Sequence, residues 1–256
     1  MVLVVDIGNT NIVLGVYEKD ELTFTARIAT NKDKTADEYS VILSGIFMLN
    51  NVVPQEIEGI IISSVVPPLT SIFELSLSRF SEAPFIVVGP GIKTGFSIKI
   101  DNPAQLGTDM VCNVAGALAE FEKGPMIVID MGTATTITVV DENRNILGGS
   151  ISPGLRLSLN ALSGGTAQLP FIDLDNVKKV IGTNTIDCMQ SGVIYGCASM
   201  IDGMIERISE QLQAKPRIII TGGMSSKVLP HCKSSLYHRP NLLVSGLYSL
   251  YLKNKN

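Results

Sequence analysis

The amino-acid sequence predicts an α/β fold that is built twice, with mixed β-sheets flanked by helices. One observation is a pattern that occurs near the start as LVVDIGNTNIVLGVYEKDEL and again past the midpoint as MIVIDMGTATTITVVDENRN. Each copy is an apolar run that ends in Asp-x-Gly and continues through small polar residues into a second β-rich run. The other observation is that each copy begins a triplet of expected strands, and that each triplet is followed by helices. Together they suggest two related halves with a nucleotide between them.

The first half begins with three expected strands, at residues 2–5, 12–17 and 22–29. Thr35 and Glu38 have the spacing of a capping box, which predicts a helix from there to about residue 49. A strand at 58–65, a helix from Pro67 to about residue 80, a strand at 84–88 and a helix at about 107–121 are expected to follow. The first domain is therefore predicted to cover residues 1–122.

The second half, predicted as a domain of residues 123–256, repeats the hairpin at 126–140 and the strand at 145–152. A long helix is predicted at 184–213, because apolar residues recur there every three or four positions. Gly192, Gly196 and Gly203 lie inside this helix, and each costs roughly 1 kcal/mol relative to Ala. That cost predicts close packing of another backbone, and the alternative is a local bend. A strand at 217–221 and a helix at 242–252 complete the half.

Composition excludes several classes of protein. With a net charge of −4 and no cluster of Lys or Arg, the chain is not expected to bind nucleic acid by bulk electrostatics. No apolar run approaches the ~20 residues of a membrane span, and the apolar start lacks the basic flank of a signal peptide. The four cysteines have no paired spacing, which indicates neither zinc nor disulfides. We therefore expect a soluble cytoplasmic protein that interacts with neither nucleic acid nor membrane.

The repeated Asp-x-Gly turns are the first candidate site. Asp6 with Gly8 and Asp130 with Gly132 each end a buried strand that doubles back as a hairpin. Glycine lets the backbone approach an anion such as phosphate, whereas the carboxylate must hold a hydrated cation or orient a nucleophile. The alternative is an Asp that only caps its own turn, which two copies in matching context disfavour. Further hydroxyl and amide donors are expected from Thr10, Asn11, Thr133, Thr135 and Thr136.

Two further segments are candidates. Thr221-Gly222-Gly223 follows a strand, and paired glycines there suit an adenosine site, although they also suit an ordinary tight turn. Asp109 follows Gly107 and Thr108 in the first turn of a predicted helix, where the helix dipole favours a carboxylate whether or not it is functional. Beside a phosphate site, Asp109 would accept the proton of an attacking hydroxyl.

Taken together, these motifs resemble those of the type III pantothenate kinases, of the acetate/sugar kinase, Hsp70 and actin superfamily. The resemblance covers almost the whole chain and rests on DIGNTN at 6–11, DMGTATT at 130–136, PGL at 153–155, TAQLP at 166–170, Asn184-Thr185, QSG at 190–192 and TGG at 221–223. It implies duplicated ribonuclease H-like (actin-like ATPase) domains and a transferase that phosphorylates pantothenate with ATP, the first step of coenzyme A synthesis. It also implies a divalent metal, a monovalent cation and a homodimer.

The resemblance also implies roles for individual residues. The ATP site is expected to comprise Asp6, Ile7, Gly8, Asn9, Thr10, Asn11, Ile12, Val13 and Thr133. Asp6 would hold the divalent metal, magnesium, through water, and Asp130 would hold the monovalent cation, potassium or ammonium. Asp109 would be the general base toward the pantothenate hydroxyl. The substrate-binding residues would be Gly107, Thr108, Asp109, Met110 and Thr185, the last from across the dimer interface.

Two positions depart from the family's pattern. The family usually has Arg at the position of Met110, and it commonly has Tyr three residues before the Pro of its Asn-Pro turn, where this chain has Ile100. Both changes remove polar groups from the expected pantothenate pocket and leave the ATP residues intact. The hypotheses are therefore a pantothenate kinase, a non-catalytic regulatory protein like the related Bvg accessory factors, and a kinase for another small hydroxylated substrate.

Overall fold

The computed structural model describes residues 1–121, 124–174, 177 and 179–255, which form two compact units. Unit 1 comprises Met1–Gly95, Asp101–Glu120 and Asn241–Asn256, and unit 2 comprises Phe96–Ile100 and Phe121–Pro240. Each unit contains one copy of the repeated pattern. The division differs from the predicted boundary after residue 122, because the C-terminal helix packs on the sheet of unit 1 and a short strand at 97–98 pairs with the sheet of unit 2.

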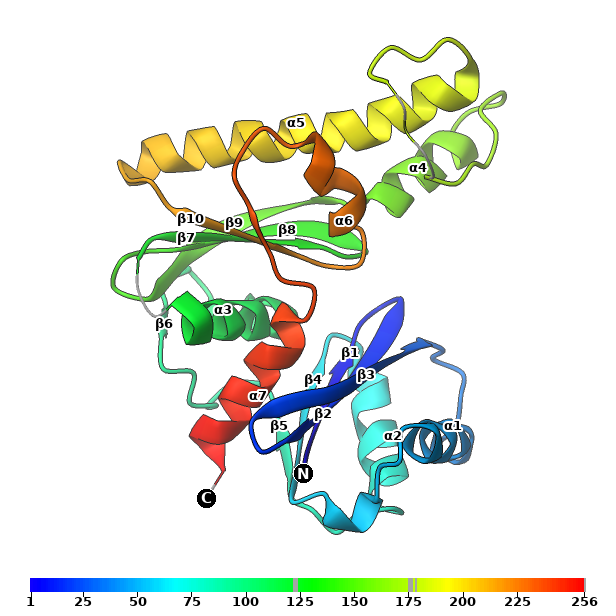
Figure 1. The fold of residues 1–256 in the computed structure, drawn as a ribbon, viewed down its shortest axis with the longest axis vertical. Helices are drawn as coiled ribbons and strands as arrows, with labels where there is room; N and C mark the ends of the chain where they lie inside the picture. Colours follow the sequence, from blue (N-terminus) through cyan, green and yellow to red (C-terminus); the bar gives the residue numbers. More distant parts are fainter. Residues whose placement is uncertain (122–123, 175–176, 178, 256) are drawn as a thin grey trace. The chain divides into compact units, whose positions relative to one another are not determined.

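Unit 1 contains a five-stranded mixed sheet in the order β3-β2-β1-β4-β5 (Figure 1). Its strands are β1 (Val2–Ile7), β2 (Asn11–Glu18), β3 (Glu21–Ala29), β4 (Gly59–Ser64) and β5 (Phe85–Val87). β1 pairs antiparallel with β2 and parallel with β4, so that Asp6 lies opposite Ser63 and Ile7 opposite Ser64. The carboxyl ends of β1 and β4 therefore meet at one edge of the sheet, where open α/β sheets bind their ligands.

Helices cover both faces of this sheet. α1 (Ala36–Leu49) and α2 (Pro67–Leu77) lie on one face and α7 (Leu242–Asn254) on the other, and α3 (Thr108–Phe121, of which 108–120 belong to unit 1) packs on α7. Short 3₁₀ turns lie at Pro54–Glu56 and Pro103–Gln105. α1 and α2 pack on each other and on the sheet, with the rings of Tyr39 and Phe73 4.7 Å apart. The predicted capping box of α1 is confirmed, because Glu38 N–H donates to Thr35 Oγ1 at 3.3 Å and Thr35 N–H donates to Glu38 Oε2 at 2.8 Å.

α3 and α7 cross at two glycines within unit 1. A Cβ atom at Gly246 would overlap the carbonyl oxygen of Cys112, and one at Gly116 would overlap the carbonyl oxygen of Leu242. The two helix backbones are therefore in direct contact. Only glycine permits this approach.

Unit 2 repeats the arrangement with a six-stranded sheet in the order β11-β10-β7-β8-β9-β6 (Figure 1). Its strands are β6 (Ser97–Ile98), β7 (Met126–Met131), β8 (Ala134–Val140), β9 (Asn145–Pro153), β10 (Arg217–Thr221) and β11 (Tyr237–His238). Its helices are α4 (Leu155–Gly164), α5 (Thr185–Leu212) and α6 (Ser225–Val228), followed by a 3₁₀ turn at Leu229–His231. β7 pairs antiparallel with β8 and parallel with β10, as β1 does with β2 and β4. β8 pairs antiparallel with β9 as β2 does with β3, so the predicted duplicated α/β fold is confirmed.

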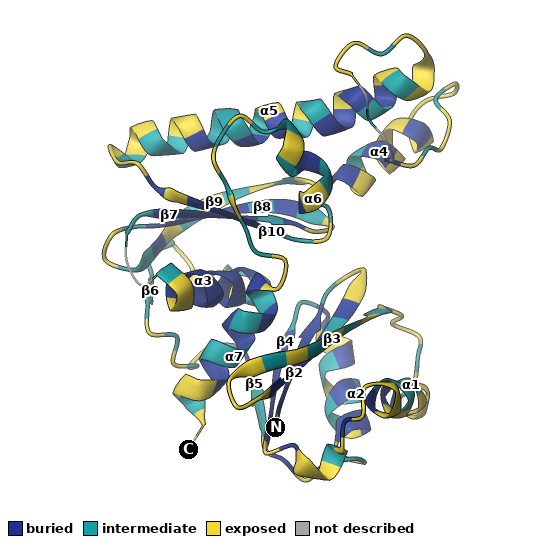
Figure 2. Ribbon diagram, viewed as in Figure 1, coloured by how far each residue is buried: buried dark blue, intermediate teal, exposed yellow. Residues whose placement is uncertain are grey.

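The glycines of α5 have no close backbone neighbour among the described residues. Nothing in the described part of the chain lies within 4 Å of a Cβ atom built at Gly192 or Gly196, and only the Arg207 guanidinium lies near Gly203. Close packing of another backbone of the same chain therefore does not explain them. The apolar face of α5 does pack as predicted, with Met189, Val193 and Ile201 in the core of unit 2 (Figure 2).

Candidate active site

The first Asp-x-Gly turn connects β1 to β2 in unit 1. Gly8 N–H donates to Asn11 O at 3.0 Å, and a Cβ atom at Gly8 would lie only 2.9 Å from that oxygen. The end of β3 supports the turn, because Thr30 Oγ1 donates to Gly8 O at 2.6 Å. Asp6 lies at the end of β1 and is 9% exposed. The turn therefore holds one carboxylate beside a backbone that a ligand can approach closely.

The residues predicted to bind ATP fall into two groups in the structure. Asn9, Thr10 and Asn11 are exposed at the tip of the turn, and Gly8 and Val13 beside them are partly exposed. Ile7 and Ile12 are fully buried in the core of unit 1. Ile7 and Ile12 therefore offer a ligand backbone groups only, and their side chains stabilise the hairpin.

The second turn connects β7 to β8 in unit 2. Gly132 N–H donates to Ala134 O at 3.0 Å, as in the first turn, and Thr133 is exposed at the tip. Gly154 N–H donates to Thr133 O at 3.1 Å, so the start of α4 packs on this turn. Thr135, by contrast, is fully buried, and its hydroxyl does not line an open site. The expectation that Thr135 donates to phosphate is therefore not supported by its burial.

The Gly222-Gly223 turn follows β10 and lies directly against the second turn. Gly222 has a φ angle of 94°, and a Cβ atom there would lie 2.5 Å from Asp130 Oδ1 and 2.6 Å from the Met131 carbonyl carbon. β10 pairs with β7 so that Thr221 lies opposite Asp130. Two features of this position favour glycine: the positive φ angle, which other residues rarely adopt, and the lack of space for a Cβ atom beside Asp130.

Asp109 lies half-buried in the first turn of α3 in unit 1. Its Oδ1 accepts from Met110 N–H at 2.9 Å, which is the helix-capping role expected of any carboxylate at this place. Burial nevertheless raises the pKa of Asp109 above its ordinary value, and the backbone N–H groups of Met110 and Asp109 offset this only in part. A carboxylate with a raised pKa is a stronger proton acceptor than an exposed cap.

The thiol of Cys112 in α3 is fully buried, and its pKa is affected by both Asp6 and Asp109. Burial and then the carboxylate of Asp6 raise the pKa of the Cys112 thiol well above its usual range; Asp109 adds to this, and a hydrogen bond with Ser63 opposes it. Cys112 therefore remains a neutral thiol. Asp6 and Asp109 lie in the same part of unit 1, because Ser63 lies opposite Asp6 in the sheet and donates a hydrogen bond to Thr108, the neighbour of Asp109.

A chain of hydroxyl groups fixes α3 to the same edge of the sheet. Ser63 Oγ donates to Thr108 Oγ1 at 3.1 Å, and Thr108 Oγ1 donates to the Ser64 carbonyl at 3.2 Å. Ser63 lies opposite Asp6 in the register of β1 and β4. Ser63, Ser64 and Cys112 were not predicted from the sequence. The available signal was the serine pair that ends the buried strand Ile60–Ile62, at the same edge as Asp6.

The remaining predicted substrate residues differ in exposure. Met110 is buried, with 7% of its surface exposed, and Thr108 points its hydroxyl at β4. Thr185 is exposed at the start of α5 in unit 2, after Asn184, whose side chain accepts from Asp187 N–H at 2.9 Å. The structure thus brings Asp6 and residues 107–110 together in unit 1, and the Asp130 and Gly222 turns together in unit 2.

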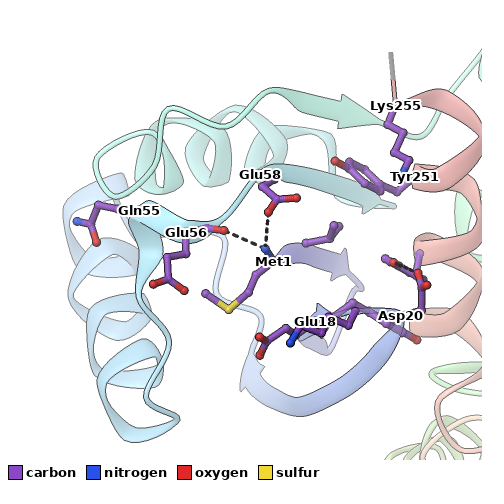
Figure 3. Close-up of a pocket in the computed structure, with 12 residues that line it drawn as sticks. Met1, Glu18, Asp20, Gln55, Glu56, Glu58, Tyr251 and Lys255 are labelled. Carbon is purple, nitrogen blue, oxygen red and sulfur yellow. Dashed lines mark hydrogen bonds and ion pairs between the residues drawn. The ribbon is translucent and has the colours of Figure 1, made fainter.

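A separate cleft of about 610 Å³ lies at the opposite end of the unit 1 sheet, near the amino end of β1 (Figure 3). The Met1 ammonium group donates to the Glu56 carbonyl at 2.9 Å, and Tyr248 donates to Asp20 Oδ1 at 2.6 Å. Burial, with the Asp20 hydrogen bond as the next cause, raises the pKa of Tyr248 to about 12. This cleft is not part of the candidate site, which lies at the carboxyl ends of the strands.

Comparison with known proteins identifies the family of the chain. The family model for type III pantothenate kinase matches residues 2–207. A type III pantothenate kinase from Exiguobacterium sp. is 41% identical over all of both chains, and one from Halalkalibacterium halodurans is 41% identical over 99% of this chain and all of that one. The chain belongs to the type III pantothenate kinase family.

Solved structures with the same fold are more distant. A Baf family protein from Campylobacter jejuni has a TM-score of 0.62 at 19% identity over 98% of each chain. Component A of the (R)-2-hydroxyglutaryl-CoA dehydratase from Acidaminococcus fermentans has a TM-score of 0.59 at 14% identity over 99% of each. A ROK hexokinase from Thermus thermophilus has a TM-score of 0.55 at 12% identity over 99% of each. Identities this low show the shared fold alone.

The donor groups of this type III pantothenate kinase family member suit hydrated cations better than a dedicated metal cage. Among the described residues, no group of three or more His, Cys, Asp or Glu is arranged to hold a metal ion. Asp6 and Asp130 instead offer one carboxylate each beside a backbone turn. Magnesium is commonly held this way, through water, one or two carboxylates and the phosphates of its nucleotide.

Proposed function

We propose that this protein transfers the γ-phosphoryl group of ATP to the hydroxyl of pantothenate and forms 4'-phosphopantothenate, the first step of coenzyme A biosynthesis. The observation that carries the proposal is a half-buried carboxylate of raised pKa, Asp109, close to the Asp6 turn in a member of the type III pantothenate kinase family. No described helix combines the length and apolar character needed to cross a membrane. The reaction would take place in the cytoplasm.

Asp109 would act as the general base. Its carboxylate would accept the proton of the pantothenate hydroxyl as that oxygen attacks the γ-phosphate. The raised pKa of Asp109 makes it a better acceptor, and the Ser63–Thr108 hydrogen bond fixes the helix turn from which it extends. The exposed Asn9, Thr10 and Asn11 would donate to the phosphates, with Thr133 as a further ATP contact. Little covalent chemistry is required, because this transfer depends on positioning and electrostatics.

Two cations would bind beside these residues, one at Asp6 and one at Asp130. Asp6 would hold magnesium through water, and the ion would supply positive charge to the phosphates. Asp130 would hold a monovalent cation, potassium or ammonium, since it is the second carboxylate at a phosphate turn and lies against Gly222. No zinc-like site is required for either role.

We also propose a homodimer formed through unit 2. Apolar side chains are exposed around α4 and the start of α5, namely Ile151 at 73%, Leu157 at 49%, Phe171 at 77%, Ile181 at 79% and Ile186 at 47% (Figure 2). A mainly apolar groove of about 690 Å³ runs between α4 and α5 and includes the open positions of Gly192 and Gly196. A second copy would cover these surfaces and give the α5 glycines a close-packed neighbour. Thr185 lies in this region and would reach the partner's substrate.

Another small hydroxylated substrate is the second candidate. Met110 favours it, because the apolar side chain is buried where the family usually has Arg. A non-catalytic regulatory role is disfavoured by the intact Asp109.

One assay separates these functions. The full chain would be incubated with MgATP, potassium and either pantothenate or a panel of analogues that keep the hydroxyl and change the carboxylate. Pantothenate phosphorylation supports the lead proposal, transfer only to an analogue supports the second, and no transfer to any acceptor contradicts both. Sedimentation at micromolar concentration tests the dimer, which a monomeric result would overturn.

A further inference from the structure

A buried serine and a histidine lie behind the Gly222 turn of unit 2, and the proposed mechanism uses neither. Ser225 is 1% exposed, and its Oγ lies 2.7 Å from the Gly222 carbonyl oxygen and 2.8 Å from His238 Nε2. His238 belongs to β11, which pairs with β10 so that His238 lies opposite Ile220. The histidine and the turn are therefore held by neighbouring strands.

The hydrogen-bond directions follow from the groups present. A carbonyl oxygen only accepts, so Ser225 uses its hydroxyl proton for the Gly222 carbonyl, which also accepts from Ser225 N–H at 3.1 Å. The hydroxyl oxygen then accepts from His238, which requires a proton on Nε2. His238 thereby fixes the hydroxyl in the orientation that holds Gly222.

The conformation of Gly222 in turn determines what lies beside the second phosphate turn. Its positive φ angle turns the chain back over β7, and Met224 N–H donates to the Met131 carbonyl at 3.2 Å. The Gly222 Cα lies against Asp130, with no space for a Cβ atom between them. A change in the Gly222 carbonyl would therefore alter both the Gly222-Gly223 turn and the space beside Asp130.

We propose that Ser225 and His238 are positioning residues for ATP, because they hold the Gly222-Gly223 turn in the conformation that receives the adenosine part of the nucleotide. Neither residue contacts ATP, and both act through the Gly222 carbonyl. The inference rests on the proposed function, in which this turn is the adenosine-binding segment. It assigns a role to an edge-strand histidine that is distant in sequence from every phosphate motif.

Nucleotide binding to three variants of the full chain tests the proposal. The dissociation constant for MgATP would be measured by calorimetry for Ser225→Ala, His238→Asn and His238→Gln. Loss of one neutral hydrogen bond predicts about 3- to 10-fold weaker binding for Ser225→Ala and His238→Asn. His238→Gln should bind within about twofold of wild type, because the glutamine amide can donate from the position of Nε2. KM for pantothenate should not change in any of them.

Two matched controls exist in the chain. Ser226 is exposed next to Ser225, and His231 is half-buried but packs edge-to-face against Tyr195 with ring centroids 4.6 Å apart. Ser226→Ala and His231→Ala should leave MgATP binding unchanged. If Ser225→Ala does not fold, the comparison of His238→Asn with His238→Gln still tests the proposal. The two side chains carry the same amide, and only that of glutamine can reach the position of Nε2.

The outcomes are distinct from those of the function assay. MgATP affinity equal to wild type in folded Ser225→Ala and His238→Asn would overturn the proposal, as would equal losses in His238→Asn and His238→Gln. If wild type binds MgATP but phosphorylates no pantothenate, the proposed substrate is wrong and the binding comparison still tests the positioning role. If wild type binds no MgATP, both proposals fail.

Discussion

The carboxylate of Asp109 occupies the space in which a side chain at Gly107 would lie. A Cβ atom at Gly107 would overlap Asp109 Oδ1, so the glycine keeps the carboxylate folded back onto the start of α3. There, Oδ1 accepts from Met110 N–H while the group remains half-buried. The same contact that caps the helix therefore also fixes the proposed base in a partly desolvated position, and the two roles of Asp109 do not exclude each other.

Replacing Asp109 by Asn should abolish most turnover and leave the fold intact. A positioned base typically contributes ~10²–10⁴-fold, so kcat should fall by about that factor with MgATP affinity unchanged. Asp101→Asn, at an exposed carboxylate in the same unit, is the matched control and should retain activity. A kcat near that of wild type in Asp109→Asn would reduce Asp109 to a helix cap.

The stability of Asp109→Asn relative to wild type should depend on pH. Because burial raises the pKa of Asp109, the folded protein binds this proton more tightly than the unfolded chain does. Ionisation of Asp109 then lowers the free energy of unfolding as pH rises through the folded pKa, and Asn cannot ionise. Asp109→Asn should therefore be more stable than wild type at neutral pH, and the difference should disappear below the ordinary Asp pKa of about 4. Urea unfolding at several pH values measures it.

The parts of the fold that were predictable are local in sequence. The repeated hairpins follow from apolar runs that end in Asp-x-Gly, and α1 follows from Thr35 and Glu38. α4 was not predicted, because Pro153-Gly154 resembles a loop and only Leu155, Leu159 and Ser163 mark its buried face. The division into units was also different, since the packing of α7 on the first sheet joins residues far apart in sequence.

The same distinction applies to the candidate site. Asp6, Asp130 and Gly222 could be found because each ends a strand in a recognisable turn. Ser63 has a weaker signal, because the serine pair ends a buried strand but only the strand register places Ser63 opposite Asp6. His238 could not be found, because its significance comes from its position beside the Gly222 turn. Single residues in ordinary sequence surroundings carry no local signal of such partners.

Activity should require a monovalent cation that Asp130 holds in part. Losing a hydrogen bond or contact with a charged group costs roughly 1.5–3 kcal/mol, so Asp130→Asn should raise the half-saturating potassium concentration about 10- to 100-fold. Glu142→Gln, at an exposed carboxylate of unit 2, is the control. Titration with potassium and ammonium measures the effect. Full wild-type activity in buffer free of both ions would remove this role from Asp130.

Because α3 and α7 are in direct backbone contact, alanine should destabilise the protein at Gly246 but not at Gly45, which has no close neighbour among the residues that the structure describes. Gly246→Ala should lower the free energy of unfolding by about 1–3 kcal/mol, because the new methyl group would overlap the Cys112 carbonyl. Gly45 in α1 has nothing within 4 Å of a Cβ atom, so Gly45→Ala should raise stability by up to about 1 kcal/mol. Urea unfolding measures both changes, as shifts of the midpoint with an unchanged m-value. Equal stabilities for both variants would contradict direct backbone contact at Gly246.

Met110 is the position at which the chemistry and the affinity of this protein can be separated. If the protein phosphorylates pantothenate, the missing Arg should weaken substrate binding without stopping the transfer. A hydrogen bond to a charged group is worth roughly 1.5–3 kcal/mol, or on the order of 10–100-fold in affinity. Met110→Arg should then lower KM for pantothenate by up to about that factor with kcat little changed, because the contact would exist in ground and transition states alike.

Burial makes this a demanding test. Met110 is 7% exposed, and a guanidinium group there must reach the substrate or remain buried without a partner, at a high cost in free energy. Met110→Leu, which keeps the apolar volume, is the control and should behave like wild type. A folded Met110→Arg variant with a higher KM, beside a wild type that already binds pantothenate tightly, would show that the pocket of this chain is built around the methionine. Its affinity would then come from apolar contact instead of the charge pairing usual in the family.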